Sequence, residues 1–401
     1  MADEVPWRWF VALDGGELDG LLGSAGLLRF DWPSRAIKYR FYDGISAGHN
    51  VTLSPDGKRL LLGNFSQQIL IIDTNTLDEI ARHTTMGVEE SDYRLRSNTH
   101  HLWYDDTTFL AAVGEHLYKF HLADLGHPEK LGAHHLRNVH EIRWTSGEHR
   151  YVLMGDLGPE DSGARQVGIF DLLRRESTIV RLPATVWHVA VHPDRNIGYA
   201  ATYSIAAQDD DFVDWGPAYT REYIVEIDLA NAVITRSWSS SAAFPIHLNS
   251  DLEIYVGDGV EKLYVAAGGS HTVVELDLHD FATTRVMAVE PSWWRRPFPL
   301  RQWWRDVWGA LLRKSIFTNS HLFLQAYVVT GRRFFDGVYC NRVSPDGRFL
   351  VAGNRGHNYI RVMDRATLAT VSETFLPHLP NGLHLGMHHS ELRGLDKMRV
   401  S

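Results

Sequence analysis

The sequence predicts an all-β fold of repeated four-stranded units, and three observations lead to this prediction. Short apolar strands that end in Asp recur along the chain. Strands closed by turns of the Ser-Pro-Asp-Gly kind precede them. The two termini also complement each other, because the N-terminal segment lacks a first strand and the C-terminal segment supplies one. Such repeats, closed on themselves, predict a seven-bladed β-propeller.

The repeating strand ends in a hydrophobic residue followed by Asp. It occurs as LLRFD, ILIID, VGIFD, YIVEID, TVVELD and YIRVMD, which end at Asp31, Asp73, Asp171, Asp228, Asp277 and Asp364. A seventh copy, LYKFH, has His121 in the Asp position. Seven copies predict seven blades. The 87-residue interval from Asp277 to Asp364 is longer than the others and indicates an insertion between blades five and six.

The first strand of each blade runs into a turn, as in VTLSPDGKRLLLGN and NRVSPDGRFLVAGN. Near the C-terminus, GLHLGMHHSE has no partner strands after it, whereas RWFVAL, GLLRFD and IKYRFY at the N-terminus have no first strand. We expect these segments to pair in one blade, a strand clasp that closes the ring and hides the sheet edges. Residues 1–401 are therefore expected to form a single propeller domain.

Two segments carry a resemblance to a known family. LSPDGKRLLLGNFSQQILIIDTNTLDEIAR and VSPDGRFLVAGNRGHNYIRVMDRATLATV resemble blades of the YVTN type of seven-bladed propeller, and the other five blades match in rhythm. This resemblance implies the fold and says little about function, because propellers include enzymes, lyases and binding platforms.

Composition narrows the class of protein. A net charge of −9 and a pI of about 6.2 argue against nucleic-acid binding, which normally needs a basic face. The single cysteine, Cys340, allows no internal disulfide and suits a reducing compartment. The N-terminal sequence has no signal-peptide pattern, and no segment is apolar enough to span a membrane. These features predict a cytoplasmic protein.

Histidine is unusually frequent, with 22 in the chain. When the innermost strands are aligned on their closing turns, His49 and His140 share one register, and the next register contains His100, Glu141, His188 and His384. His247 lies just before the innermost strand of blade five. Because innermost strands begin at one mouth of a propeller channel, we expect histidines from at least five blades to meet there. The predicted metal ligands are His49, His100, His140, His188, His247 and His384.

Two interpretations of these histidines remain open. Each one could simply line a wet channel and hydrogen-bond to the backbone. Together, neutral imidazoles suit a divalent transition metal, for which we expect iron first, followed by zinc, manganese or copper. Glu141, next to His140, could orient a ligand or act as a general base, or it could be a surface-facing strand residue.

The insertion, residues 290–336, is rich in tryptophan. Leu300, Trp303, Trp304, Val307, Trp308, Leu311 and Leu312 follow helical spacing, and arginines lie on the opposite side. This spacing predicts an amphipathic helix. The helix could pack on the propeller, could form a lid in which Trp303, Trp304 and Trp308 enclose a substrate, or could contact a membrane surface through residues 299–314.

The leading hypothesis is a metal-dependent enzyme of the oxygenase or lyase type that acts on a largely apolar or aromatic small molecule. In outline the predicted arrangement is similar to the carotenoid-cleaving dioxygenases, seven-bladed propellers with iron held by four histidines, and to metal-dependent propeller lyases. These resemblances concern architecture only. The alternatives are a non-catalytic binding platform and a metal-free lyase or isomerase that uses one histidine as a base.

Overall fold

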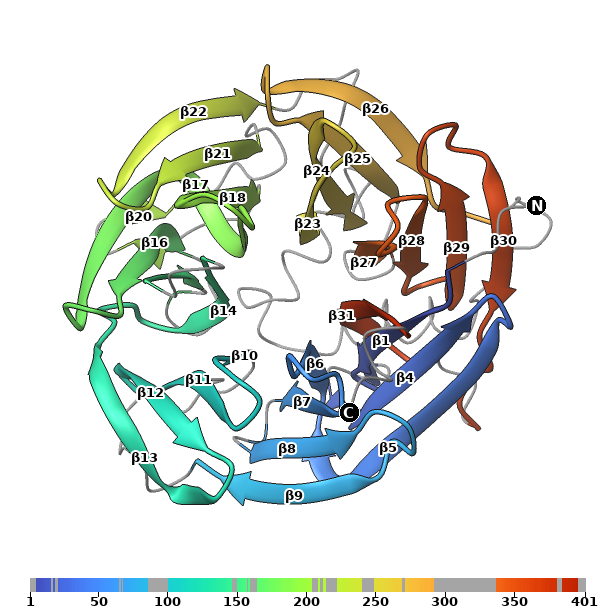
Figure 1. Cartoon of the computed structure of the whole chain (residues 1–401), viewed down its shortest axis with the longest axis horizontal. Coiled ribbons are helices and arrows are strands. Elements are labelled where there is room, and N and C mark those ends of the chain that lie inside the picture. The colour runs from blue at the N-terminus through green and yellow to red at the C-terminus, as the bar shows by residue number, and fades with distance from the viewer. Residues whose placement is uncertain are drawn as a thin grey trace.

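The computed structural model describes residues 5–15, 17–18, 21–64, 66, 68–85, 100–145, 150–156, 158, 164–203, 208–209, 212–213, 222–239, 249–268, 271–291, 337–380 and 384–395. All elements in these residues are β-strands, and their sheets surround a central axis like the blades of a propeller (Figure 1). Within the described ranges, no helix has the length and apolar character needed to cross a membrane.

Five of the sheets contain four strands each. The first is formed by β31 (Met387–Gly394), β1 (Trp7–Leu13), β4 (Ser24–Trp32) and β5 (Ala36–Ser46), and the second by β6 (Gly48–Leu53), β7 (Arg59–Asn64), β8 (Gln68–Asp73) and β9 (Glu79–Thr84). The third contains β10 (His101–Trp103), β11 (Thr108–Val113), β12 (His116–His121) and β13 (Asp124–Ala133). The fourth contains β23 (Asn249–Gly257), β24 (Val260–Ala267), β25 (Thr272–Asp277) and β26 (Ala282–Ala288). The fifth contains β27 (Val338–Val343), β28 (Phe349–Asn354), β29 (Tyr359–Asp364) and β30 (Thr370–Phe375).

A larger sheet contains seven strands: β14 (Val139–Trp144), β15 (Tyr151–Asp156), β16 (Ala164–Asp171), β17 (Glu176–Val191), β18 (Ile197–Tyr203), β21 (Tyr223–Asp228) and β22 (Val233–Ser239). Two small hairpins pair β2 (Glu17–Leu18) with β3 (Leu21–Leu22) and β19 (Gln208–Asp209) with β20 (Phe212–Val213).

The prediction of seven separate sheets needs correction, because the described strands form six large sheets. The cause is β17, which extends over 16 residues without a turn. Its first half pairs with β16 and its second half with β18, so one strand serves as the outer strand of one four-stranded unit and the inner strand of the next. The segment RLPATVWH, residues 181–188, stays extended through this junction.

The predicted helical insertion is also corrected. The described chain is all-β, and the helix expected between blades five and six has no counterpart in it. Residues 299–314, together with Trp303, Trp304 and Trp308, lie outside the described residues.

The innermost strands form a closed ring. Each innermost strand contacts the next one around the axis, in the order β6, β10, β14, the second half of β17, β23, β27 and β31. Strand β31 in turn contacts β6 and completes the ring. Figure 1 shows these strands around the axis, with the more exposed strands, such as β9 and β13, at the periphery. The ring brings residues from distant parts of the sequence to one axis.

The strands follow from the sequence in simple ways. Middle strands such as RLLLGN and TFLAAV are continuous apolar runs, because both faces pack on neighbouring sheets. In the first Ser-Pro-Asp-Gly turn, the Oγ of Ser54 accepts a hydrogen bond from the backbone N–H of Arg59 at 3.0 Å, and Gly57 adopts a φ of 72° that favours glycine. The turn between β27 and β28 repeats this arrangement, because Oγ of Ser344 accepts a hydrogen bond from the backbone N–H of Phe349 and Gly347 has a φ of 69°.

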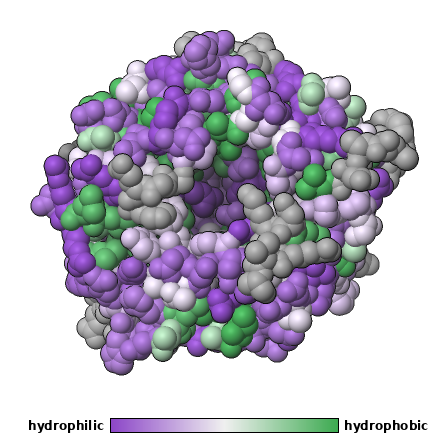
Figure 2. All heavy atoms as spheres, viewed as in Figure 1, coloured by the Kyte–Doolittle hydropathy of each residue, from purple (hydrophilic) through white to green (hydrophobic). Residues whose placement is uncertain are grey.

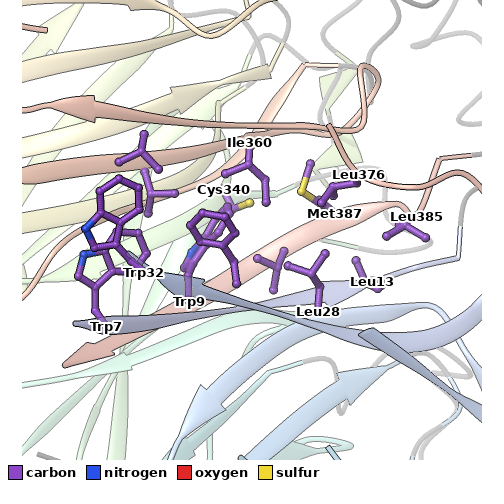
Figure 3. Close-up of a cluster of buried hydrophobic side chains, with 14 of the residues drawn as sticks. Trp7, Trp9, Leu13, Leu28, Trp32, Cys340, Ile360, Leu376, Leu385 and Met387 are labelled. Carbon is purple, nitrogen blue, oxygen red and sulfur yellow. The ribbon is translucent and has the colours of Figure 1, made fainter. Parts of the chain in front are cut away.

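The termini meet in the sheet of β31, β1, β4 and β5. Strand β1 lies between β31 and β4 and pairs antiparallel with both. Under this sheet, Trp7, Trp9 and Trp32 pack with Cys340 and Met387 in a cluster whose members are at most 3% exposed (Figure 3). The cluster joins the closing sheet to the sheet of β27–β30, and the burial of apolar side chains from both sheets stabilises the closure.

Candidate metal centre

The innermost strands begin with irregular pairing. The register shifts between Gly48 and Asn50 in β6, between Asn249 and Asp251 in β23, and between Val338 and Cys340 in β27. Strands β14 and β31 are irregular near the same end. A bulge adds a residue and turns a side chain away from the regular alternation, and bulges are common beside functional sites. Here they help to direct side chains toward the axis, where the ring is hollow and lined by hydrophilic residues (Figure 2).

Four buried histidines meet at this end of the axis. His49 comes from β6, His100 directly precedes β10, His140 comes from β14 and His389 comes from β31. One ring nitrogen of each lies within 4.8 Å of the others, and none of the four residues is more than 6% exposed. Their ring centroids are 4.6 to 6.0 Å apart. We call these four residues the central histidine cluster.

Burial favours the neutral form of three of these imidazoles, those of His49, His100 and His389. It lowers the pKa of His49 and of His100 well below the ordinary value of 6.5, and the neighbouring imidazoles lower each pKa further by charge repulsion. Burial also lowers the pKa of His389, although Asp251 opposes this shift. A neutral imidazole carries a nitrogen lone pair, which is the form that binds a metal.

The residues of the cluster fit a transition metal ion. The Nε2 atom of His389 is fully buried and has no hydrogen-bond partner among the described residues. The Nε2 atoms of His49 and His140 are only 2.5 Å apart, so the two nitrogens lie close enough to approach one ion. Two nitrogens bound at about 2.1 Å to one tetrahedral ion lie about 3.4 Å apart, so binding requires shifts of about 1 Å. Nitrogen donors suit iron, zinc, copper and nickel.

A buried carboxylate orients a fifth histidine next to the cluster. The Oε2 atom of Glu141 lies 3.2 Å from Nδ1 of His188 and accepts a hydrogen bond from the backbone N–H of Val189 at 2.9 Å. Its Oε1 atom lies 2.7 Å from Arg143. Burial alone would raise the pKa of Glu141, but Arg143 and His188 outweigh burial and lower this pKa to about 2. The His188 ring centroid lies 5.1 Å from that of His140 and 4.8 Å from that of His389.

A second buried carboxylate lies behind His389. The Oδ1 atom of Asp251 is 3.8 Å from Nδ1 of His389, and its Oδ2 atom lies 2.6 Å from Nη1 of Arg342. Arg342 and His389 outweigh the effect of burial and lower the pKa of Asp251 to about 2. Pairs of a carboxylate and a histidine commonly orient metal-binding imidazoles.

The predicted site residues have different locations. His49, His100 and His140 belong to the central cluster. His188 and Glu141 form the adjacent pair, so Glu141 is a buried residue and not a surface one. His384 is buried but is not one of the four converging histidines. His247, Trp303, Trp304 and Trp308 lie outside the described residues.

The sequence analysis missed His389 and Asp251. In GLHLGMHHSE the innermost strand begins at Met387, later than the alignment on turns assumed, so His389 occupies the position that was assigned to His384. The signal that could have identified it is the pair His388–His389 inside the strand. The ring of His388 packs 4.2 Å from that of His49 and 4.5 Å from that of Tyr339, measured between centroids. Cys340 belongs to the hydrophobic cluster of the closing sheet.

Comparisons with known proteins identify the fold and no family. No protein-family model and no curated protein sequence matches the chain. Among solved structures, the chain is similar to dihydro-heme d1 dehydrogenase NirN in complex with DHE, with a TM-score of 0.53 and 12% identity over 97% of this chain and 76% of that chain. At this identity the similarity shows the fold alone. It supports a propeller and gives no support for the YVTN type in particular.

Proposed function

We propose that this protein is a metal-dependent enzyme in which His49, His100, His140 and His389 bind one divalent transition metal ion. The observation that carries the proposal is the convergence of four buried imidazoles, with ligand atoms within 4.8 Å, at the centre of the ring. Four neutral ligands leave the charge of the ion unbalanced, and an ion of higher coordination number keeps positions open for a substrate. Such an ion supplies Lewis-acid or redox chemistry.

The reaction we propose is of the oxygenase or lyase type on a small organic molecule. Iron is the first candidate ion, and zinc, manganese and copper follow. Tyr339, whose ring packs against His388, would provide an aromatic wall next to the cluster. An aromatic or apolar substrate would lie against this wall with favourable ring contacts.

Glu141 and Asp251 act in this proposal as positioning residues. Both oxygens of Glu141 are engaged, one by Arg143 and the other by His188 and a backbone N–H. A carboxylate held in this way orients its histidine and is poorly placed to collect a proton from a substrate. Asp251 is held by Arg342 and orients His389 in the same way.

The donor set favours a bare ion over haem iron. Haem iron takes four nitrogens from its macrocycle and one or two axial ligands from the protein. Four protein nitrogens within 4.8 Å of one another occupy the space that the plane of a macrocycle would need.

Metal analysis tests the proposal. The full chain, purified without an affinity tag or chelator, is expected to contain close to one central metal ion, and His140→Ala is expected to lose it. The matched control is His101→Leu, because His101 is also buried next to the cluster but packs edge-on against Phe109. Absence of central metal from the parent, even after incubation with Fe(II), Zn(II) or Mn(II), would contradict the proposal and favour a binding platform or a metal-free enzyme.

A further inference from the structure

We infer a second metal site, formed by His271, Glu290 and His357, that takes a zinc-like divalent ion. We call these three residues the rim site. Their ligand atoms lie within 4.8 Å of one another. His271 directly precedes β25, Glu290 follows β26, and His357 lies between β28 and β29. The site therefore joins two neighbouring sheets through the connections between their strands, and none of its residues comes from the innermost ring.

Backbone contacts fix the segments that carry the three ligands. The N–H of Val289 donates to the carbonyl oxygen of His271 at 2.9 Å. Arg361 donates to the carbonyl oxygen of Glu290 at 3.1 Å. The N–H of His357 donates to Oδ1 of Asn354 at 3.0 Å. A site whose residues are held in this way loses little conformational entropy when it binds an ion.

Asn354 determines which ring nitrogen of His271 is unprotonated. This asparagine is fully buried, and its Nδ2 atom donates to the carbonyl oxygen of Val289 at 2.8 Å while its Oδ1 atom accepts from His357. These two backbone partners fix the orientation of the side-chain amide. The same Nδ2 atom lies 3.0 Å from Nδ1 of His271. Because Nδ2 is a donor, Nδ1 of His271 is the unprotonated nitrogen that accepts this hydrogen bond, and an ion bound at Nδ1 would take the place of the Asn354 amide there.

Glu290 lies beside the same nitrogen. Its Oε1 atom lies 3.3 Å from the same Nδ1 atom of His271. A carboxylate oxygen and an imidazole nitrogen at this distance can bind the same ion. Ligand atoms of one tetrahedral zinc ion are about 3.4 Å apart, which agrees with the observed spacing.

The donor set also indicates the kind of ion. Two imidazoles and one carboxylate form a set used by catalytic zinc sites, which keep a fourth position open. Magnesium and calcium prefer sets made only of oxygens. The His271 and His357 ring centroids are 5.5 Å apart, so both rings can reach one ion after small movements. Zinc, or cobalt in its place, is the appropriate probe.

The test counts zinc ions bound to the full chain. Protein stripped with a chelator is dialysed against Zn(II), and the bound metal is measured for the parent, for Glu290→Gln and for His357→Ala. We expect each rim variant to bind one equivalent fewer than the parent, and Zn(II) to raise the unfolding temperature of His140→Ala but not that of His140→Ala combined with Glu290→Gln. Glu290→Gln preserves shape, so circular dichroism should report an intact fold.

The matched control is Asp124→Asn, which alters an exposed pair in which Nδ1 of His127 lies 3.0 Å from the Asp124 carboxylate. It should leave the zinc count unchanged. Equal counts in the parent and both rim variants would overturn the inference, as would an equal loss in Asp124→Asn. A parent that binds one zinc ion, lost in the rim variants and retained in His140→Ala, would support the rim site while contradicting the central metal centre.

Discussion

At the scale of single residues, burial decides what the charged and titratable groups of the axis can do. Burial lowers the pKa of His49, His100 and His389 and so favours the neutral form, which is the form that can bind a metal. Farther along the axis, Arg342 is buried between Asp251 and Glu253, 2.6 Å from an oxygen of the first and 3.7 Å from an oxygen of the second. One guanidinium cannot compensate both carboxylates equally, and Asp251 has the shorter contact.

Glu253 is therefore expected to limit stability above neutral pH. Burial raises its pKa to about 7, Asp251 and Glu391 contribute in the same direction, and Arg342 opposes them. Between its ordinary pKa of 4.5 and about 7, folded Glu253 holds a proton that the unfolded chain releases, so stability falls as the pH rises through this window. Glu253→Gln removes the effect. The variant should match the parent at pH 4.5 and exceed it by about 1–2 kcal/mol at pH 8, less than the full linkage value because the side chain is 24% exposed.

Urea unfolding of the parent and of Glu253→Gln at pH 4.5, 6 and 8 would check this prediction. An advantage of the variant that stays constant across the three pH values would show that the carboxyl group does not titrate in this window.

At the scale of strands and turns, the recurring Asp has a structural cause. The Oδ1 atom of Asp364 accepts hydrogen bonds from the backbone N–H and the hydroxyl of Thr367, both at 2.8 Å. The Oδ1 atom of Asp73 likewise accepts hydrogen bonds from the backbone N–H groups of Asn75 and Thr76. Each carboxylate satisfies donors that the turn leaves outside the sheet. The sequence repeat is therefore a repeat of turns, and it carries no catalytic information.

Replacement of Asp364 with Ala should lower the free energy of unfolding by about 1–2 kcal/mol, because two hydrogen bonds of the turn lose their acceptor. Asp364→Asn retains an oxygen and should cost less. Asp43→Ala, at an exposed position within β5, provides the control and should change stability by less than about 0.5 kcal/mol. Denaturation curves for the three variants test this expectation, and similar midpoints for Asp364→Ala and Asp43→Ala would contradict it.

These turns also explain how far the sequence could predict the fold and the site. Strands such as RLLLGN and the meeting of the terminal strands follow from apolar runs and turn residues, which are local. The continuity of β17 was not predictable, because Pro183 and Ala184 look like a turn and only the pairing with β16 and β18 keeps them extended. The bulges are equally hidden, since they depend on the partner strand. The sequence analysis placed the start of the last strand too early in GLHLGMHHSE. It therefore assigned His384 to the position that His389 occupies.

At the scale of the whole molecule, the central cluster connects the ends of the chain. His49, His100 and His140 come from the first part of the sequence, and His389 comes from β31, the strand that closes the ring against β1. An ion bound by all four would hold the closing strand to three other innermost strands. The hydrophobic cluster around Trp7, Trp9 and Met387 holds the same strand by a different interaction (Figure 3). If the proposed metal is bound, closure has two supports, one apolar and one that depends on metal.

The two supports can be separated by mutation. A ligand that binds only the folded state stabilises it by an amount that grows with the ratio of its concentration to its dissociation constant, about 2.7 kcal/mol at a hundredfold ratio. Metal should therefore raise the unfolding temperature of the parent, and a chelator should lower it. His389→Leu should reduce this dependence to the part that the rim site supplies, and should abolish it when combined with Glu290→Gln, while retaining most of the stability of the metal-free chain. Trp9→Ala should do the opposite, lowering the unfolding free energy by about 3–5 kcal/mol through the cavity it leaves and keeping the response to metal. Calorimetry with and without chelator would compare the three proteins, and a metal response in His389→Leu equal to that of the parent would show that the closing strand supplies no ligand.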